Sequence, residues 1–262
     1  PRLYRGEHAF LLQNPDGRVV FTIPYEQRYT LIGTTDVSFE GDPAGATISQ
    51  GEIRYLCESV NAYFDRRIAV EDITWTYAGV RSLSDDEAEN ASMVTRDYKL
   101  ELAQTSGEAV LLSVFGGKIT TYRRLAEMAL DKLQPFVGGT GRDWTDRAPL
   151  PGGDFAQGNF TAFLNGVRQR WPFLADDLAE RLARAYGSRI EKVLAGAQRM
   201  DDLGKHYGAG LTRAEVDYLQ ANEWAVTAED ILWRRTKLAL HMSDDERQRL
   251  ASAIALGSPL CV

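Results

Sequence analysis

The sequence is poor in cysteine, has no long apolar run and carries no excess of positive charge, and each shortage excludes a class of protein. The two cysteines, Cys57 and Cys261, lie far apart, which excludes a disulfide framework or a cysteine-rich metal site and favours a reducing compartment. Because no run of about 20 apolar residues occurs, no membrane-spanning helix is predicted. A net charge of -7 without a basic face argues against nucleic acid as a partner.

What is present is the composition of a globular protein with a substantial core. Of the 262 residues, 44% are hydrophobic and 26% are charged, which suits one large domain or two of ordinary size. The chain begins at Pro1 without a methionine or a signal peptide, directly in sequence that has the pattern of folded structure. We therefore expect it to be a piece of a longer protein.

The first third of the chain has the pattern of an antiparallel sheet with one helix. Two apolar runs within AFLLQNPDGRVVFTIPY flank the turn signal at 14–17, and RYTLIGTTDV supplies a third strand. A helix is predicted over about 49–65, because Ser49 and Glu52 have the spacing of a capping box. The apolar face of this helix holds Ile53, Leu56, Cys57, Val60 and Phe64.

The middle of the chain returns to strand patterns and then changes to a helical period. Strands are predicted in EDITWTYAGVRSLS (71–84), MVTRDYKLELA (93–103) and AVLLSVF (109–115). A helix is predicted from Thr120 to about Phe136. The stretch 137–153 is rich in glycine, proline and aspartate and is predicted to be a linker.

Beyond the linker almost every segment has a helical period. Helices are predicted over 159–170, 175–186, 188–198, 212–223, 227–240 and 243–256, with Asp176, Thr212, Thr227 and Ser243 as N-caps. The predicted fold class is α+β: an antiparallel-sheet domain with flanking helices, followed by an all-α C-terminal domain.

One junction between a strand and a helix concentrates residues that suit an anion. In LLSVFGGKITTYRRLAEMAL an apolar strand ends at Gly116 and Gly117, and Lys118, Thr120 and Thr121 open the helix. The first N–H groups of a helix point outward with partial positive charge, glycines allow close approach, and a lysine adds a cation. A phosphate, a carboxylate or a ring that becomes anionic fits such a place.

The alternative for this junction is a tight turn with a solvated lysine. The spacing is not that of a Walker A loop, and no Gly-x-Gly-x-x-Gly unit occurs in the sequence.

Two arginines within the strand patterns are candidate anion ligands. Arg81 ends the run WTYAGVR, and Arg96 lies inside MVTRDYKLEL. A guanidinium that projects from a sheet offers a planar fork for phosphate or carboxylate, and two of them with Lys118 would hold a dianion. The alternative is an ordinary surface ion pair, for which Asp36 and Asp85 are candidate partners of Arg96.

In the helical part, WRRTKLAL places Trp233, Arg234, Arg235 and Lys237 close together. A basic helix with an aromatic side chain could contact anionic lipid headgroups. The alternative, which we favour, is a solvated face with Trp233 in the core.

Several segments carry a family resemblance. IGTTDVSFEGDP, WTYAGVRSL, VTRDY and LLSVFGGKITTYRRLAEMAL together resemble the FAD-dependent glycerol-3-phosphate dehydrogenases, the aerobic respiratory enzymes of the D-amino-acid-oxidase-like flavoproteins. LPGGDF, RWPFLADDLAERLARAYGS and DILWRRTKLALHMS resemble the C-terminal helical part of the same family. The segments keep their order, and the resemblance covers nearly the whole chain.

The resemblance implies a flavoenzyme that oxidises sn-glycerol 3-phosphate to dihydroxyacetone phosphate. Hydride passes from the substrate to FAD and electrons then pass to membrane quinone, so the family is cytoplasmic and associates peripherally with the inner face of the cell membrane. Residues 1–112 would correspond to the substrate-binding domain, 113–136 to the last strand and helix of the FAD domain, 137–153 to a linker and 154–262 to the C-terminal helical domain. The N-terminal half of the FAD domain would lie upstream of Pro1.

The resemblance also assigns site residues. Arg81, Arg96 and Lys118 would bind the substrate; Gly116, Gly117, Lys118, Ile119, Thr120 and Thr121 would contact FAD; and Lys118 is the one catalytic candidate. A helix start aimed at the flavin ring would stabilise the negative charge that develops there. Ser82 stands where the family usually has proline, which makes the orientation of Arg81 less constrained. The family's candidate base, a histidine, would lie upstream of Pro1.

Two other functions stay open at this point. Glycerol-3-phosphate oxidase, which passes electrons to oxygen, shares these motifs. A flavin-free module that binds a phosphorylated metabolite or a partner protein is the other alternative. The 262 residues alone are expected to bind FAD poorly and to be inactive, because the adenine and pyrophosphate contacts would belong to the upstream half. A homodimer also stays open.

Overall fold

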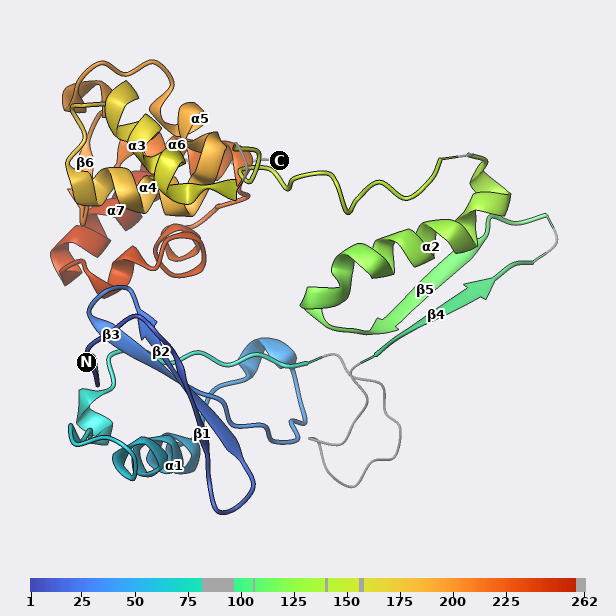
Figure 1. Ribbon diagram of the computed structural model, residues 1–262, viewed down its shortest axis with the longest axis horizontal. Coiled ribbons are helices and arrows are strands. Elements are labelled where there is room, and N and C mark those ends of the chain that lie inside the picture. Colours follow the sequence, from blue (N-terminus) through green and yellow to red (C-terminus); the bar gives the residue numbers. More distant parts are fainter. Residues whose placement is uncertain (82–96, 106, 140, 156–157, 258–262) are drawn as a thin grey trace. The chain divides into compact units, whose positions relative to one another are not determined.

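The computed structural model describes residues 1–81, 97–105, 107–139, 141–155 and 158–257 of the chain (Figure 1). The chain divides into two compact units, Pro1–Arg147 and Ala148–Val262. This division falls inside the range 137–153 that the sequence predicts to be a linker. The first unit contains small antiparallel sheets and helices, and helices dominate the second, which agrees with the coarse α+β prediction.

The N-terminal part of the first unit is a three-stranded antiparallel sheet of β1 (Phe10–Gln13), β2 (Val19–Tyr25) and β3 (Tyr29–Gly33). The predicted turn joins β1 to β2, where the Gly17 N–H donates to the Asn14 carbonyl at 3.0 Å. Gly17 has a φ of 81°, which glycine adopts at little cost. The predicted meander is therefore confirmed.

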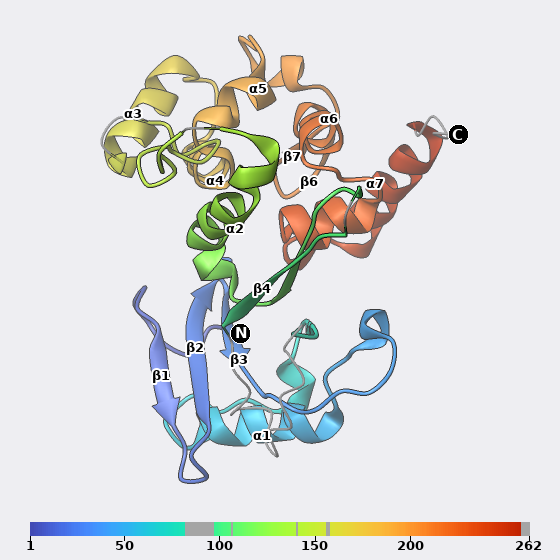
Figure 2. The same cartoon turned by 90° about the vertical axis from the view of Figure 1, so that its right-hand side faces the viewer.

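One amphipathic helix, α1 (Gln50–Asn61), packs against this sheet (Figure 2). The predicted capping box starts the helix: the Glu52 N–H donates to Ser49 Oγ at 3.2 Å, and the Ser49 N–H donates to Glu52 Oε2 at 2.8 Å. The core between helix and sheet includes Leu12, Val20, Leu56, Cys57 and Val60. Burial of this apolar face stabilises the helix, and it makes Cys57 the buried thiol that its position in the pattern predicts.

The aromatic run after α1 does not form the predicted strand in its described part. Two 3-10 turns, η1 (Pro43–Gly45) and η2 (Val70–Asp72), lie before and after α1, and residues 73–81 are irregular. The strand predicted over 71–84 is therefore wrong as far as Arg81. Aromatic and β-branched residues favour strands, but a strand also needs a hydrogen-bonded neighbour, and within the described residues none pairs with 73–81.

The second part of the first unit is a strand pair followed by a helix. β4 (Tyr98–Ala103) and β5 (Leu111–Gly116) pair antiparallel along their whole length. A 3-10 turn, η3 (Ile119–Thr121), then leads into α2 (Tyr122–Val137) (Figure 1). The described parts of these elements agree with the sequence prediction. A division at residue 112, which the family resemblance implies, would fall inside the paired strand β5 and stays a prediction.

This strand–helix segment has no apolar core of its own among the described residues. Its exposed apolar side chains are Leu102, Leu111, Val114, Phe115, Ile119, Tyr122, Met128, Leu130, Phe136 and Val137. The one buried side chain of α2 is a glutamate, Glu127. Because two strands and a helix need a covered apolar face for stability, this segment is incomplete by itself.

The second unit is a bundle of short helices around one apolar core. Its elements are α3 (Phe160–Arg170), α4 (Asp176–Tyr186), η5 (Gly187–Arg189), α5 (Ile190–Leu194), η6 (Met200–Leu203), β6 (His206–Gly208), β7 (Leu211–Thr212), α6 (Arg213–Asn222), the π-helix η7 (Asp230–Arg235), η8 (Leu238–Leu240) and α7 (Asp244–Gly257). Most of them contribute to the core, which includes Ile190, Leu211, Leu219, Ile231 and Leu250. Among the helices of the described residues, none is long and apolar enough to cross a membrane.

Three features of the helical unit differ from the prediction. The helix predicted over 227–240 consists of η7 and η8, which are separated at Lys237, where φ is 59°. The helix predicted over 188–198 ends at Leu194, because Ala195 has a positive φ of 39°. The strand pair β6–β7 is not predicted, since strands this short carry too little pattern.

The helix starts in this unit follow the predicted caps with one exception. Thr212 caps α6, and Ser243 Oγ accepts from the Glu246 N–H at the start of α7 at 3.3 Å. Thr227 Oγ1 accepts from the Asp230 N–H, where η7 begins, at 3.1 Å. The exception is α4, whose N-cap is Ala175 rather than Asp176.

The end of α6 has an unusual residue for its backbone conformation. Trp224 has a positive φ of 55° and is 84% exposed. Helices commonly end in a left-handed residue, but glycine or asparagine usually takes that place, because a bulky side chain is strained there. The corner of the helical unit at Trp224 therefore presents a large aromatic ring to solvent.

Candidate functional site

The junction between β5 and α2 depends on two glycines with left-handed backbone. Gly116 has a φ of 68° and Gly117 a φ of 102°. A Cβ on Gly117 would lie 3.3 Å from the Tyr98 Cβ, which is tighter than most such contacts. Tyr98 is the partner of Gly116 in the β4–β5 ladder, so the chain leaves the sheet close against the neighbouring strand. Both conditions select glycine, as the sequence predicts for this junction.

Lys118 and the residues after it lie open at the start of the helix. Lys118, Ile119 and Thr120 are exposed, and within the described residues the Lys118 ammonium has no hydrogen-bond or ion-pair partner. The N–H and the hydroxyl of Thr121 both donate to the Lys118 carbonyl, at 3.0 and 2.9 Å. Thr121 therefore does not cap the helix with its side chain. The helix start has no side-chain cap.

One of the two candidate arginines has a partner in the structure. Arg81 forms an ion pair with Asp36, which the sequence offers as a partner of Arg96, and both side chains are partly exposed. Within the described residues, no hydrogen bond or ion pair joins Arg81 to Lys118. Arg96 lies outside the described residues. The predicted cluster of Arg81, Arg96 and Lys118 therefore stays a prediction.

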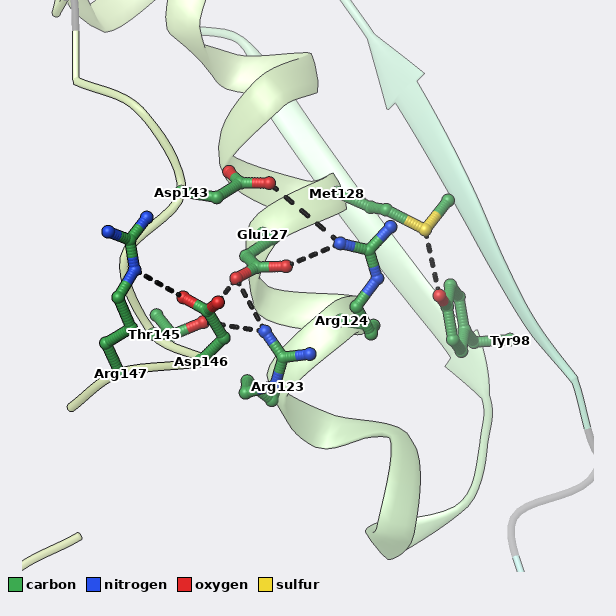
Figure 3. A network of polar contacts seen from close by, with 9 residues as sticks. All are labelled: Tyr98, Arg123, Arg124, Glu127, Met128, Asp143, Thr145, Asp146 and Arg147. Carbon is green, nitrogen blue, oxygen red and sulfur yellow. Dashed lines mark hydrogen bonds and ion pairs between the residues drawn. The ribbon is translucent and has the colours of Figure 1, made fainter. Parts of the chain in front are cut away.

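A polar network that the sequence does not predict surrounds Glu127 on α2 (Figure 3). The Glu127 carboxylate accepts hydrogen bonds from Arg123 at 2.9 Å and from Arg124 at 2.8 Å. The hydroxyl of Thr145, which follows α2 in the chain, donates to the same carboxylate. The spacing of Arg123 and Glu127, four residues apart on a helix, is a signal in the sequence, whereas nothing there indicates Thr145.

Glu127 remains a carboxylate although its side chain is only 5% exposed. The hydrogen bond from Thr145 lowers the pKa of Glu127. The charges of Arg123 and Arg124 and the hydrogen bond from Arg124 lower it further, and burial opposes them. The ionised form is therefore the stable one at neutral pH, and it balances part of the charge of the two arginines.

Two family models match the chain. The model for FAD dependent oxidoreductases matches residues 2–123, and the model for the C-terminal domain of alpha-glycerophosphate oxidase matches residues 144–260. The chain therefore contains a region of the FAD dependent oxidoreductase type, followed by a region of the type found at the C-terminus of alpha-glycerophosphate oxidase. The first match includes the glycine junction, and the second begins next to Thr145. Arg123, at the end of the first match, donates a hydrogen bond to Thr145 in the second, so the network around Glu127 joins the two matched regions.

Individual relatives are similar over almost the whole chain. A glycerol-3-phosphate dehydrogenase of Pseudomonas aeruginosa is 51% identical over 99% of the chain, and an aerobic glycerol-3-phosphate dehydrogenase of Escherichia coli is 44% identical over 96%. A D-erythritol 1-phosphate dehydrogenase of Brucella abortus is 47% identical over 94%. The chain covers 50%, 50% and 49% of these relatives, so it spans about half the length of the curated relatives it matches.

In its described residues, the region that matches the C-terminal domain of alpha-glycerophosphate oxidase does not present WRRTKLAL as a free basic helix. Arg234 pairs with Glu229 at 3.0 Å and with Asp230 at 2.9 Å. The Lys237 ammonium donates to the carbonyls of Trp233 and Arg234. The Trp233 side chain packs against the apolar core. These contacts favour the solvated-face interpretation of WRRTKLAL over a lipid-binding helix.

The same region buries a second glutamate, Glu215, in a network that also escaped prediction. Arg181 donates to both carboxylate oxygens at 2.7 Å, and the Tyr186 hydroxyl donates to one of them at 2.7 Å. Burial, followed by the negative charge of Glu215, raises the pKa of Tyr186, which therefore remains a donor. The network joins α4 to the start of α6, and we assign it a structural role in the helical unit.

Proposed function

We propose that the chain forms the substrate-binding and C-terminal part of an FAD-dependent dehydrogenase that oxidises sn-glycerol 3-phosphate to dihydroxyacetone phosphate. Two relatives described above are glycerol-3-phosphate dehydrogenases and one is a D-erythritol 1-phosphate dehydrogenase, so polyol phosphates are the common substrate class. In this proposal residues 1–112 form the antiparallel-sheet substrate domain and 113–136 complete the flavin domain.

The observation that carries the proposal is the open helix start behind two left-handed glycines. Gly116 and Gly117 leave backbone where a side chain would otherwise stand, the helix start has no side-chain cap, and Lys118 is exposed. This donor set fits the electron-rich edge of a flavin ring. When bound, FAD supplies the group that accepts hydride from the substrate. Lys118 stabilises negative charge there, and Thr120 is the better hydroxyl donor, because the Thr121 hydroxyl already serves the Lys118 carbonyl.

The many exposed apolar side chains of β4, β5 and α2 support the same assignment. Large exposed apolar patches on a soluble protein usually mark a surface that another part covers. We infer that the part upstream in the longer protein covers it, since the relatives are about twice as long as the chain. The 262 residues alone should then bind FAD poorly and show no dehydrogenase activity. Stoichiometric flavin retained by this chain through gel filtration would refute that inference.

The central test uses the inferred longer protein, of which this chain is a part, with bound FAD. It replaces single lysines at the start of α2 and along it. Lys118→Met should lower kcat/KM by about a hundredfold, the usual effect of removing one donor that stabilises developing negative charge. Lys132→Met is the matched control, because Lys132 is also exposed and lies far along α2. Equal kinetics of the two variants would remove Lys118 from the site.

A second test concerns the substrate arginines. Arg81 and Arg96 bind the phosphate or the hydroxyls of the substrate in this proposal, and Asp36 holds the Arg81 guanidinium in place. Arg81→Ala should weaken substrate binding by about 1.5–3 kcal/mol, as expected for a hydrogen bond to a charged group. Asp36→Asn keeps the guanidinium and should weaken binding far less. Equal losses in both variants would indicate that the ion pair is only structural.

Kinetic measurements on the longer protein also identify the substrate and the electron acceptor. The longer protein should prefer sn-glycerol 3-phosphate to D-erythritol 1-phosphate, and its reduced flavin should be reoxidised faster by a quinone than by oxygen in an anaerobic stopped-flow experiment. Use of quinone entails peripheral contact with the inner face of the cell membrane, and a homodimer is compatible with it. Faster reoxidation by oxygen would instead assign the chain to an oxidase, and absence of flavin from the longer protein would favour a flavin-free binding module.

A further inference from the structure

Glu127 is the one buried residue of α2, a helix on which several apolar side chains are exposed. Leu130, Phe136 and Val137 of α2 are exposed, whereas the Glu127 side chain is 5% exposed. A buried carboxylate is unfavourable unless it is paired and hydrogen-bonded. No apolar cluster creates this burial within the described residues. The polar partners of Glu127 come from its own helix and from the segment 143–147.

Two of these partners are cations near the start of α2. Arg123 and Arg124 follow Tyr122, the first residue of the helix, where the partial positive charge of the helix end disfavours further cations. Glu127 lies one turn further along and pairs with both of them at 2.9 and 2.8 Å. The carboxylate thus balances positive charge close behind the glycine junction.

The other partners come from the chain beyond the helix. The Thr145 hydroxyl donates to the Glu127 carboxylate and accepts from the Arg123 guanidinium at 3.3 Å. An Asp143 carboxylate oxygen lies 3.9 Å from a guanidinium nitrogen of Arg124. Figure 3 shows this segment running alongside α2, with the Glu127 carboxylate between the two. One carboxylate therefore contacts both the helix that follows the glycine junction and the beginning of the region matched to the C-terminal domain.

We propose that Glu127 is a positioning residue that sets the charge behind the start of α2 and anchors the segment 143–147 to that helix. Its effect on flavin rests on the proposed function, in which the glycine junction contacts FAD. Loss of the carboxylate leaves Arg123 and Arg124 unbalanced, so negative charge at the junction becomes more favourable. It also removes the acceptor that holds Thr145.

The test compares three variants of the longer, FAD-containing protein. Glu127→Gln removes the charge and weakens the anchor, Thr145→Val removes only the anchoring hydroxyl, and Asp131→Asn removes an exposed carboxylate one turn further along α2. Two quantities are measured under native conditions: the rate of tryptic cleavage after Arg142 and Arg147, and the midpoint potential of bound flavin at low ionic strength.

Glu127→Gln should increase the cleavage rate about tenfold, the factor expected for loss of one hydrogen bond to a charged group, and should raise the midpoint potential. Thr145→Val should increase cleavage and leave the potential unchanged, and Asp131→Asn should change neither. Unchanged cleavage in Glu127→Gln and Thr145→Val overturns the anchor, and an unchanged potential in Glu127→Gln overturns the charge role. If the longer protein binds no flavin, the proposed function and the charge role fail together, and cleavage alone decides the anchor.

Discussion

The strand–helix segment 97–137 and the helical unit each bury one glutamate, in opposite surroundings. Glu215 lies within the apolar bundle and is paired with Arg181, whereas Glu127 has polar partners and no apolar cluster around it. Among the described residues these two are the buried charged side chains. The difference teaches that a buried ion pair says little about the stability of its neighbourhood, because the apolar area around it decides whether the region folds alone.

The largest expected effect comes from separating the two regions. Residues 148–262, expressed alone, should unfold cooperatively on heating, because the core of the helical unit lies entirely within them. Residues 97–147, expressed alone, should show no cooperative transition. Far-UV circular dichroism during a thermal scan measures both. A cooperative transition of residues 97–147 would contradict the conclusion that this segment cannot fold alone.

Leucine truncation probes the same difference within the 262-residue chain. Leu219→Ala should lower the free energy of unfolding by about 3–5 kcal/mol, because Leu219 is 1% exposed and leaves a cavity. Leu130→Ala should change it by no more than about 0.5 kcal/mol, since Leu130 is 58% exposed. Urea denaturation gives both values. In the longer protein the cost of Leu130→Ala should rise, and a small cost there would argue against a covered face.

The buried pair of the helical unit gives a smaller effect. Glu215→Gln should cost about 2–3 kcal/mol, at the lower end for a broken buried pair, because Arg181 can still reach solvent. Glu180→Gln is the matched control on α4: its pair with Arg184 is exposed and worth about 0.3–0.5 kcal/mol. The two costs are compared by urea denaturation. Similar costs would mean that burial does not strengthen the first pair.

The smallest effect concerns Asp230 at the start of η7. Hydrogen bonds from the Thr227 and Val226 N–H groups lower the pKa of Asp230 from 3.8 to about 2. Because the folded-state pKa lies below the unfolded one, the stabilisation is complete above pH values of about 4 and is lost as the pH falls toward about 2. Asp230→Asn should cost about 1 kcal/mol at neutral pH, and the cost should fall toward zero as the pH drops through about 2. Unfolding free energies across this range measure it, and a cost independent of pH would exclude the carboxylate as its source.

Elements with a local signal could be predicted from the sequence. The capping box of Ser49 and Glu52 lies within three residues, and Thr212 caps α6 through its own neighbours. Elements that need a distant partner could not. Residues 73–81 have the composition of a strand but no paired neighbour among the described residues. The break between η7 and η8 depends on the positive φ of Lys237, which a lysine side chain does not predict.

The candidate site divides in the same way. The position of the glycine junction follows from Gly116, Gly117 and the strand and helix patterns on either side. In the structure both residues have a positive φ, which explains why glycine stands at these positions. The partner of Arg81 could not be predicted, because Asp36 lies 45 residues earlier in the chain. Burial of Glu127 was hidden for a similar reason, since Thr145 lies beyond a linker that has no periodic pattern.

Trp224 gives the helical unit a spectroscopic probe that needs no label. Of the tryptophans in residues 148–262, Trp171 is buried and Trp233 packs against the core, whereas the Trp224 indole is in water. Of these three tryptophans, a dissolved quencher will therefore reach Trp224 first. The emission of Trp224 will shift to shorter wavelength when a protein, a lipid surface or another copy of the chain binds at that corner. In residues 148–262 expressed alone, where the exposed Trp144 is absent, titrations followed by fluorescence can thus detect a molecule that binds at this corner.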